Sequence, residues 1–212
     1  MQGYGGTNCE ASKPGSCPSK SHMKQNEYTA QFAVWAVMAS QLILSADMRT
    51  LPTSQPDCFK LLTNSEILEV NQDSAAHAPR LLFSHNVSVI EKRDGRNMTR
   101  VVTTAQGFSR KLHDGSVAVV LLNRQDRGSL TLTTSLAALG LGGGQHEHAT
   151  TCRVRDLLAR TDLPAVTNGG SLSLTVGSHE ARMVRVNCGS AVAAARDPSV
   201  ARLRLSRGSS GD

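Results

Sequence analysis

Aromatic residues and long apolar runs are scarce in this sequence. Aromatic side chains account for 3% of its 212 residues, and apolar residues of all kinds for 39%. A helix that crosses a bilayer needs about 20 consecutive apolar residues, whereas the apolar stretch 34–44 is shorter and is interrupted by Ser40 and Gln41. The sequence therefore predicts no membrane span. Its length allows a core of useful size, in one domain or in two small ones.

The first ten residues, MQGYGGTNCE, lack the two features of a secretory signal peptide. They contain neither a basic segment nor an apolar segment. If the mature protein is secreted, we expect its targeting signal to lie upstream of Met1.

The net charge is +6, and much of it lies toward the C-terminus. The arginines of this region are Arg182, Arg185, Arg196, Arg202, Arg204 and Arg207. A nucleic-acid surface would combine such charge with stacking aromatic residues, but residues 189–212 contain none. The composition favours a solvated, disordered tail over 189–212 and no nucleic-acid partner.

Five cysteines are present, and two of them lie close together in a loop rich in Gly, Ser, Pro and Lys. Cys9 and Cys17 are candidates for a disulfide that cross-links this loop. Metal binding is the alternative, but no second close pair of cysteines and no suitably spaced histidines accompany them, so we expect no metal site there. The sequence leaves the pairing of Cys58, Cys152 and Cys188 open.

Two triplets match the acceptor pattern for N-glycosylation. They begin at Asn86 (Asn-Val-Ser) and at Asn97 (Asn-Met-Thr). Both are glycosylation candidates, and together they favour a secretory or lysosomal route.

Residues 26–73 have the pattern of an α/β unit. Asn26 is a plausible N-cap, and apolar residues then recur at helical spacing from Tyr28 to Leu42. The run 42–44, Leu-Ile-Leu, is typical of a short strand buried between helices. Asn64 or Ser65 is expected to cap a later amphipathic helix that ends near Asp73.

After residue 75 the pattern changes to short strands separated by turn residues. We expect strands at 80–90, 101–112, 116–122, 130–134, 152–158, 171–176 and 181–186. Asp114-Gly115 lies between two of these runs and is a strong hairpin signal. Seven short strands with such turns predict an antiparallel sandwich.

The order and wording of these segments resemble the melibiase-type α-galactosidase and α-N-acetylgalactosaminidase family (glycoside hydrolase family 27). The resemblance rests on NEYTAQFAVWAVMASQLILSADMRTL, LLTNSEILEVNQD, KLHDGSVAVVLLNR, CRVRDLL and GSHEARMVRV, in this order. It implies α/β plus all-β architecture: the last helix–strand–helix of a (β/α)8 barrel, followed by a C-terminal antiparallel β-sandwich domain. The corresponding domains are 1–75 for the barrel remnant, 76–188 for the sandwich and 189–212 for the tail.

The resemblance implies the C-terminal segment of a retaining exo-α-galactosidase that removes terminal α-linked galactose, with no cofactor. Such enzymes use two carboxyl groups about 5 Å apart. The family's two catalytic aspartates come from earlier barrel strands, and no segment here matches their motifs, so we assign no catalytic residue. MQGYGG resembles the family's glycine-containing loop, and the residues just before that loop touch the sugar, so the resemblance makes Met1 a substrate-binding candidate. The alternative is that Met1 is only a start residue. A homodimer and a secreted, lysosomal or vacuolar location also follow from the family.

Other polar residues have plainer explanations. We expect Asp47 to pair with Arg49 rather than to act in catalysis, and Asp73 to form hydrogen bonds at the junction between the two halves. Glu66 and Glu69 are expected on the solvated face of a helix. The segment 142–148, Gly-Gly-Gly-Gln-His-Glu-His, is interpreted as a solvated loop rather than a phosphate or metal site. The residues His179 and Met183 are expected to pack and to form hydrogen bonds.

The alternative from another class is a non-catalytic product, either a truncated chain or an accessory β module that binds carbohydrate or a partner chain. Its support is physical, because one α/β unit leaves the apolar faces of Phe32, Trp35 and 42–44 without the strands that normally cover them. On this view residues 26–73 are poorly ordered in the free chain.

Overall fold

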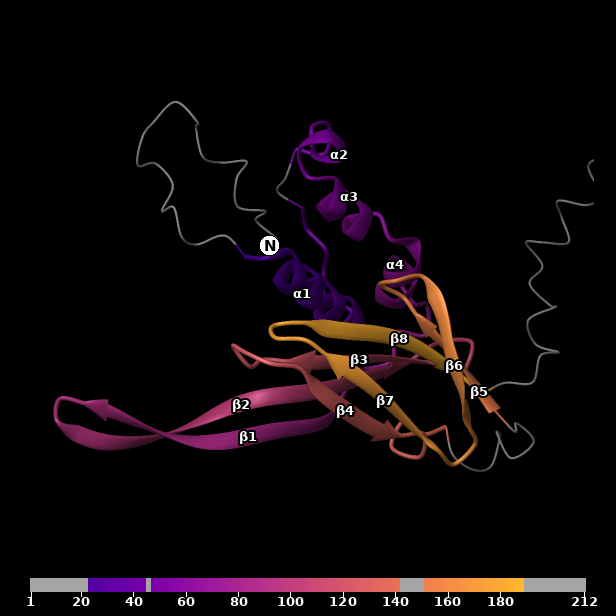
Figure 1. The fold of residues 1–212 in the computed structure, drawn as a ribbon. Coiled ribbons are helices and arrows are strands. Elements are labelled where there is room, and N and C mark those ends of the chain that lie inside the picture. Colours follow the sequence, from indigo (N-terminus) through magenta and orange to yellow (C-terminus); the bar gives the residue numbers. More distant parts are fainter. Residues whose placement is uncertain (1–22, 45–46, 142–150, 189–212) are drawn as a thin grey trace, which may run out of the picture.

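The computed structural model describes residues 23–44, 47–141 and 151–188. Within these residues, four helices precede eight strands. In space the helices lie against one face of a six-stranded antiparallel sheet, and a two-stranded sheet covers part of the other face (Figure 1). The expected fold class, a barrel remnant followed by an antiparallel sandwich, is therefore confirmed. The predicted tail at 189–212 lies outside the described residues.

Helix α1 (Gln25–Val37) begins two residues earlier than the sequence suggested, with Lys24 rather than Asn26 at its N-cap. Glu27, at position N3, makes the reciprocal contact of a capping box, because its carboxylate accepts a 2.6 Å hydrogen bond from the Lys24 backbone N–H. The helix ends at Val37 with Met38 as its C-cap, and the next residue, Ala39, has φ +51°. The N–H groups of Ala39 and Ser40 bond back to the carbonyls of Ala36 and Trp35, the pattern of a Schellman motif.

Three shorter helices follow. They are α2 (Leu51–Ser54), α3 (Pro56–Leu62) and α4 (Ser65–Asn71). Asn64 caps α4, as predicted, and its Oδ1 accepts from the N–H groups of Glu66 and Ile67. The Asn64 Nδ2 also donates to the Leu157 carbonyl at 2.8 Å, so the cap joins the helix to the sheet.

The run 42–44 does not form the predicted buried strand. Only Leu44 makes a single bridge, and Ile43 is 57% exposed. The prediction is wrong for a physical reason, since a parallel strand of this kind is stable only between neighbouring strands, and neither of the two described sheets includes residues 42–44.

The six-stranded sheet has the order β1-β2-β3-β8-β5-β6, and β4 pairs with β7 in the two-stranded sheet. The strands are β1 (Arg80–Arg93), β2 (Arg96–Lys111), β3 (Val117–Asn123), β4 (Leu130–Ser135), β5 (Thr151–Asp156), β6 (Thr161–Thr167), β7 (Ser171–Val176) and β8 (Ala181–Asn187). All seven predicted strands are present. The eighth, β6, was missed because it contains Pro164, which suits an edge strand.

Successive side chains along each strand point to opposite faces of the six-stranded sheet, and the interior is therefore divided into two hydrophobic cores. Ala118 and Val120 on β3 face the helices, together with Phe32 and Val37 of α1. The intervening residues of β3 pack with β4 and β7 in the second core. The sheet covers the face of α1 that contains Phe32, so this apolar face is not left bare. The expected poor order of residues 26–73 in the free chain stays a prediction.

A disulfide closes the far edge of the second core. It joins Cys152 at the start of β5 to Cys188 just after β8, and both cysteines are buried. The register that pairs Arg153 with Asn187 places these two cysteines side by side. Cys58 is a free, buried thiol on α3.

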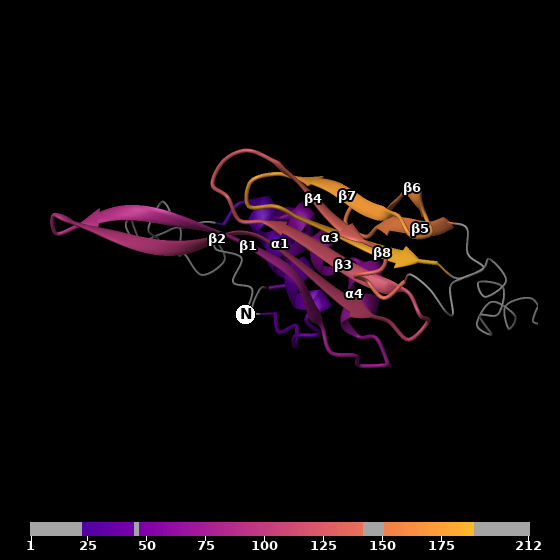
Figure 2. The same cartoon turned by 90° about the horizontal axis from the view of Figure 1, so that it is seen from below.

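Strands β1 and β2 extend well beyond the rest of the sheet as a two-stranded hairpin arm, seen projecting in both views (Figures 1 and 2). At its tip Asp94 and Gly95 both have positive φ, +52° and +76°. Asp-Gly is well suited to such a turn.

Candidate functional site

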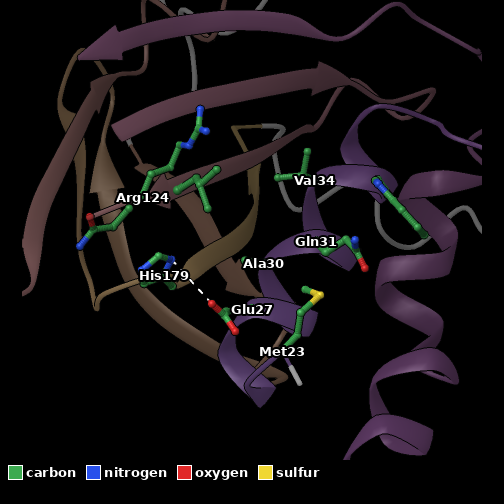
Figure 3. Close-up of a pocket in the computed structure, with 10 residues that line it drawn as sticks. Met23, Glu27, Ala30, Gln31, Val34, Arg124 and His179 are labelled. Carbon is green, nitrogen blue, oxygen red and sulfur yellow. Dashed lines mark ion pairs between the residues drawn. The ribbon is translucent and has the colours of Figure 1, made fainter. Parts of the chain in front are cut away.

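A pocket of about 530 Å³ lies where helix α1 meets the end of β3 and the turn between β7 and β8 (Figure 3). Its polar lining residues are Glu27, Gln31, Asn123, Arg124 and His179, and its apolar ones are Met23, Ala30, Val34, Trp35 and Leu122. The pocket therefore combines one aromatic side chain with several polar groups, which is typical of sites for small molecules.

Two hydrogen bonds fix the pocket wall to the helix and to the neighbouring loop. Asn26 Nδ2 donates to the Ser178 carbonyl at 2.8 Å, which ties the first turn of α1 to the β7–β8 turn. Ser178 Oγ in turn donates to the Gln125 carbonyl at 2.8 Å. Asn26 thus joins two segments 152 residues apart, rather than capping its own helix.

His179 lies between two carboxylates at the rim. Its Nε2 is 3.0 Å from Asp126 Oδ1. Its Nδ1 is 3.8 Å from Glu27 Oε1, the contact drawn as a dashed line in Figure 3. The residue has φ +53°, a left-handed backbone that directs the ring across the turn. As predicted, His179 serves as a hydrogen-bonding residue; Met183, the other member of that prediction, is fully buried in the helix-facing core.

Gln31 contributes an acceptor without a partner. Its Oε1 is buried and has no hydrogen bond within the described residues. A buried unpaired acceptor costs about 1–3 kcal/mol, so a bound molecule with a donor group would gain there.

The pocket is suited to binding rather than to glycoside hydrolysis. Glycoside hydrolysis of the retaining type needs two carboxyl groups facing one bond. Glu27 is the single carboxylate among the residues that line the pocket, and Asp126 lies on the other side of His179 with a side chain that is 94% exposed. Across 23–44, 47–141 and 151–188 no group of three acidic, His or Cys residues could hold a metal ion.

A second set of polar contacts joins the helices to the sheet. Asp73, just after α4, has a buried side chain that accepts hydrogen bonds from the backbone N–H of His113 at 3.0 Å and of Ala75 at 3.1 Å. The His113 Nδ1 lies 2.7 Å from the same carboxylate. Burial alone would raise the pKa of Asp73, but these bonds outweigh it and lower the pKa. The predicted role of Asp73 at the junction is confirmed.

Glu66 departs from its predicted place on a solvated face. Its two carboxylate oxygens accept from Arg155 Nε at 3.0 Å and Nη2 at 2.9 Å, across the junction between α4 and β5. The hydrogen bond from Arg155 lowers the pKa of Glu66, and the same bond raises the pKa of Arg155. Glu69 is more exposed, as predicted, and lies 3.7 Å from Arg185.

Arg110, on β2, is the most deeply buried basic residue of this junction, at 2% exposure. Its Nη1 donates to the carbonyls of Val70 at 2.8 Å and Asn71 at 3.3 Å, and its Nε donates to the carbonyl of His77 at 2.9 Å. The guanidinium therefore satisfies carbonyls that the end of α4 leaves unpaired.

The residues singled out in the sequence are not gathered at one site. Met1, Cys9, Cys17 and the segment 142–148 lie outside the described residues. Asp47 forms an exposed ion pair with Arg49 at 3.0 Å, as expected, and the hydrogen bond from Arg49 lowers the pKa of Asp47.

The two glycosylation candidates lie on the hairpin arm, Asn86 on β1 and Asn97 on β2, both exposed. Within the described part of the chain no helix is long and apolar enough to span a membrane.

Sequence reasoning missed Arg110, Arg155 and the pocket residues Gln31 and Arg124. For Arg110 and Arg155 the sequence contained one weak indication. An Arg on a central strand, within an alternating apolar pattern, is expected to point toward a covered face of the sheet. The pocket had none, since its lining residues come from segments far apart in the chain.

Two family models match the chain in order. The one described as Alpha galactosidase A matches residues 20–73, which contain all four described helices. The one described as Alpha galactosidase C-terminal beta sandwich domain matches residues 103–186, from the second half of β2 into β8.

Relatives in sequence carry the same names. The chain is 27% identical over 161 residues to an α-galactosidase of Oryza sativa subsp. japonica, a match that covers 76% of this chain and 32% of the relative. It is 29% identical over 115 residues to an α-N-acetylgalactosaminidase of Gallus gallus, covering 54% of this chain and 24% of the relative. The chain thus spans a third or less of the length of these relatives.

Solved structures share the fold. α-Galactosidase I from Mortierella vinacea superposes with a TM-score of 0.58 at 22% identity, over 80% of this chain and 37% of that one. The α-galactosidase of Saccharomyces cerevisiae, solved with raffinose, superposes with a TM-score of 0.61 at 17% identity, over 78% of this chain and 44% of that one. At these identities the likeness concerns the fold.

Proposed function

This chain belongs to the melibiase-type α-galactosidase and α-N-acetylgalactosaminidase family, glycoside hydrolase family 27, and on that basis we propose that it is the C-terminal segment of a retaining exo-α-galactosidase. The full enzyme would remove terminal α-linked galactose through a covalent glycosyl-enzyme intermediate. Its two catalytic aspartates would belong to polypeptide outside this chain. α-N-Acetylgalactosamine is the close alternative substrate.

The observation that carries this proposal is the pairing of two matched segments across one junction. The helices matched by the first family model are held on the sheet matched by the second, through Glu66–Arg155, Asp73–His113 and the buried Arg110. Such a junction is what a C-terminal sandwich needs in order to support the end of a barrel. The proposed domains remain 1–75, 76–188 and 189–212.

The test is an assay with a chromogenic α-galactoside. We expect no turnover by the chain alone. We expect turnover by a chimera in which the chain replaces the C-terminal segment of the rice α-galactosidase. A matched chimera with Arg110→Met should lose thermal stability while its KM stays unchanged, because Arg110 supports the junction and does not contact sugar. Turnover by the isolated chain would show that the catalytic carboxylates are not outside it.

The proposed setting follows the same reasoning. We propose a secreted, lysosomal or vacuolar enzyme, without cofactor, and a homodimer as its assembly. The disulfide between Cys152 and Cys188 supports an oxidising compartment. Sedimentation of the purified full-length protein tests the dimer.

A non-catalytic binding role is the second candidate, and the pocket at α1 favours it. Trp35 lines this pocket and is the single tryptophan of the sequence, so its fluorescence reports on occupancy. Titration with galactose and with N-acetylgalactosamine should change the emission if the pocket binds sugar. An unchanged emission, with Trp35→Phe as the blank, would reject this role for either sugar.

A further inference from the structure

Both faces of the hairpin arm formed by β1 and β2 carry exposed apolar side chains, but one face also holds the two glycosylation candidates. Residues directly opposite in an antiparallel pair have their side chains on the same face. Between Asn86 and Lys92 the register is unbroken, with Asn86 opposite Thr103 and Lys92 opposite Asn97. Because side chains alternate along each strand, Asn86, Ser88, Ile90 and Lys92 share one face, which we call the acceptor face.

The acceptor face also contains alternate residues of β2. They are Asn97, Thr99, Val101 and Thr103. A 2.9 Å hydrogen bond from Thr103 Oγ1 to Asn86 Oδ1 confirms that these side chains project together. The opposite face contains Val87, Val89, Met98, Val102 and the ion pair between Glu91 and Arg100, whose charged atoms are 3.6 Å apart.

Both acceptor triplets of the chain therefore project from one face. The asparagines and the hydroxyl residues two positions later, Ser88 and Thr99, all lie on it. Asn86 and Asn97 sit at opposite ends of a six-residue span, roughly 20 Å at the rise of a β-strand.

Two exposed apolar side chains lie between these asparagines. Ile90 is opposite Thr99, and Val101 is opposite Ser88. They are the two most exposed of the large hydrophobic residues described, at 68% and 65%. Exposed β-branched residues on a projecting two-stranded ribbon favour association with other chains. A polar and bulky group over this face would hinder such association.

We propose that Asn86 and Asn97 both carry N-linked glycans, which cover the acceptor face of the arm and shield Ile90 and Val101. The proposal rests on the secretory route proposed above. Glycans are bulky and solubilising, and one at each end of a span of this length encloses the two apolar residues from both sides. The asparagine side chains are exposed, so the folded arm accommodates both modifications.

The chemistry is a group transfer from a lipid-diphosphate-linked oligosaccharide. A bond forms between the asparagine Nδ2 and C1 of the sugar, while the bond between C1 and the diphosphate oxygen breaks. The diphosphate leaves with the electron pair, and the amide nitrogen loses one proton. Nothing is oxidised or reduced. In the folded arm the Asn86 Oδ1 holds the hydrogen bond from Thr103, and this contact does not involve Nδ2.

Occupancy is measured on the whole chain, secreted from a eukaryotic host behind an added signal sequence. Treatment with peptide-N-glycosidase in H2(18O) converts each glycosylated asparagine into labelled aspartate. We expect label at Asn86 and at Asn97, and an unlabelled asparagine at either position in the secreted protein would overturn the proposal. The added signal sequence separates the proposed secretory route from the proposed use of the two asparagines. If the chain is glycosylated in this host but carries no glycan in its natural host, the secretory route is rejected and the two acceptor sites are not.

Matched variants assign each glycan to its triplet. Thr99→Val and Ser88→Ala remove the acceptor hydroxyl while each asparagine stays in place, and each should lose the mass of one glycan. Thr99→Ser and Ser88→Thr keep a hydroxyl and should keep both glycans. The proposal would be contradicted if Thr99→Val had the same glycan mass as Thr99→Ser, or if Ser88→Ala had the same glycan mass as Ser88→Thr.

Shielding is tested by trimming the folded glycoprotein with an endoglycosidase that leaves one N-acetylglucosamine on each asparagine. Sedimentation should then shift from monomer or dimer toward larger species. The variant Ile90→Thr/Val101→Thr should suppress this shift, whereas Val87→Thr/Val89→Thr, on the opposite face, should not. Unchanged sedimentation after trimming, or suppression by the opposite-face variant alone, would show that the glycans do not shield Ile90 and Val101.

Discussion

Glu66 on helix α4 and Arg155 on strand β5, 89 residues apart in sequence, form a two-pronged ion pair with N–O distances of 3.0 and 2.9 Å. The pair crosses the junction between the helices and the sheet. Both side chains are partly exposed, at 25% and 35%, so solvent weakens their attraction. The paired geometry of the guanidinium and carboxylate nevertheless fixes the position of α4 on the sheet.

A double-mutant cycle with Glu66→Gln and Arg155→Met measures this pair. We expect a coupling energy of about 1 kcal/mol in urea unfolding, since partly exposed pairs contribute at the upper end of the range for surface ion pairs. Asp57 and Lys60, 3.5 Å apart and mostly exposed, form the control pair and should show coupling close to zero. Equal coupling in the two cycles would mean that the Glu66–Arg155 geometry contributes nothing.

Arg110→Met should cost about 2–4 kcal/mol of unfolding free energy. The substitution leaves buried carbonyls at the end of α4 without their charged donor, and each such loss is expensive. Chemical denaturation measures the change. Arg100→Met, on the exposed arm, removes only a surface contact with Glu91 and should change stability by less than about 0.5 kcal/mol.

Removal of the disulfide in Cys152→Ala/Cys188→Ala should lower stability by about 4 kcal/mol, the chain-entropy value for a loop of this length. The bridge spans a sequence separation of 36 residues. Thermal unfolding with and without reductant provides a second measurement, since reductant should destabilise the wild type more than the variant. Cys58→Ala, which keeps the disulfide, should still respond to reductant.

Stability should fall in acid because of Asp73 and Asp114. Burial opposes the ionised form of each, but hydrogen bonds from His113 and Ala75 to Asp73, and from Ser116 and Arg185 to Asp114, leave both pKa values lowered. An unfolded aspartate has a pKa near 3.9, so the unfolded state binds more protons. Their stabilisation is therefore fully present above about pH 4 and is lost as the pH falls through the folded pKa values.

Asp73→Asn and Asp114→Asn test this dependence. The stability difference between the wild type and each variant should shrink as the pH falls below about 4. Asp94→Asn, at the exposed tip of the arm, should follow the wild-type curve. A difference that stays constant from pH 7 to pH 3 would contradict the assignment.

Much of the β half could be predicted from the sequence because its signals are local. The Asp114-Gly115 and Asp94-Gly95 turns and the apolar strands specify pairing between neighbours in the chain. The edge strand β6 was missed because Pro164 argues against a strand unless its position in the sheet is known.

The helical half was predicted less well because its environment is not local. The run 42–44 has the composition of a buried strand, yet it belongs to neither described sheet, and Ile43 is exposed. Asn26 has the residue type of a cap, but its amide is used by Ser178, 152 positions away. The pocket and the buried Arg110 likewise depend on contacts that exist only after the helices pack on the sheet.

Strand β3 belongs to both halves of the interior, since Ala118 and Val120 face the helices while Val119 and Leu121 face strands β4 and β7. A shift of the β3 register by one residue would turn Ala118 and Val120 toward β4 and β7, and would turn Val119 and Leu121 toward the helices. Each core would then receive side chains that do not fit it. The packing of the helices and the packing of the two-stranded sheet therefore depend on the same register of β3. Loss of either should destabilise the other, and the described parts of the chain should unfold in one cooperative step.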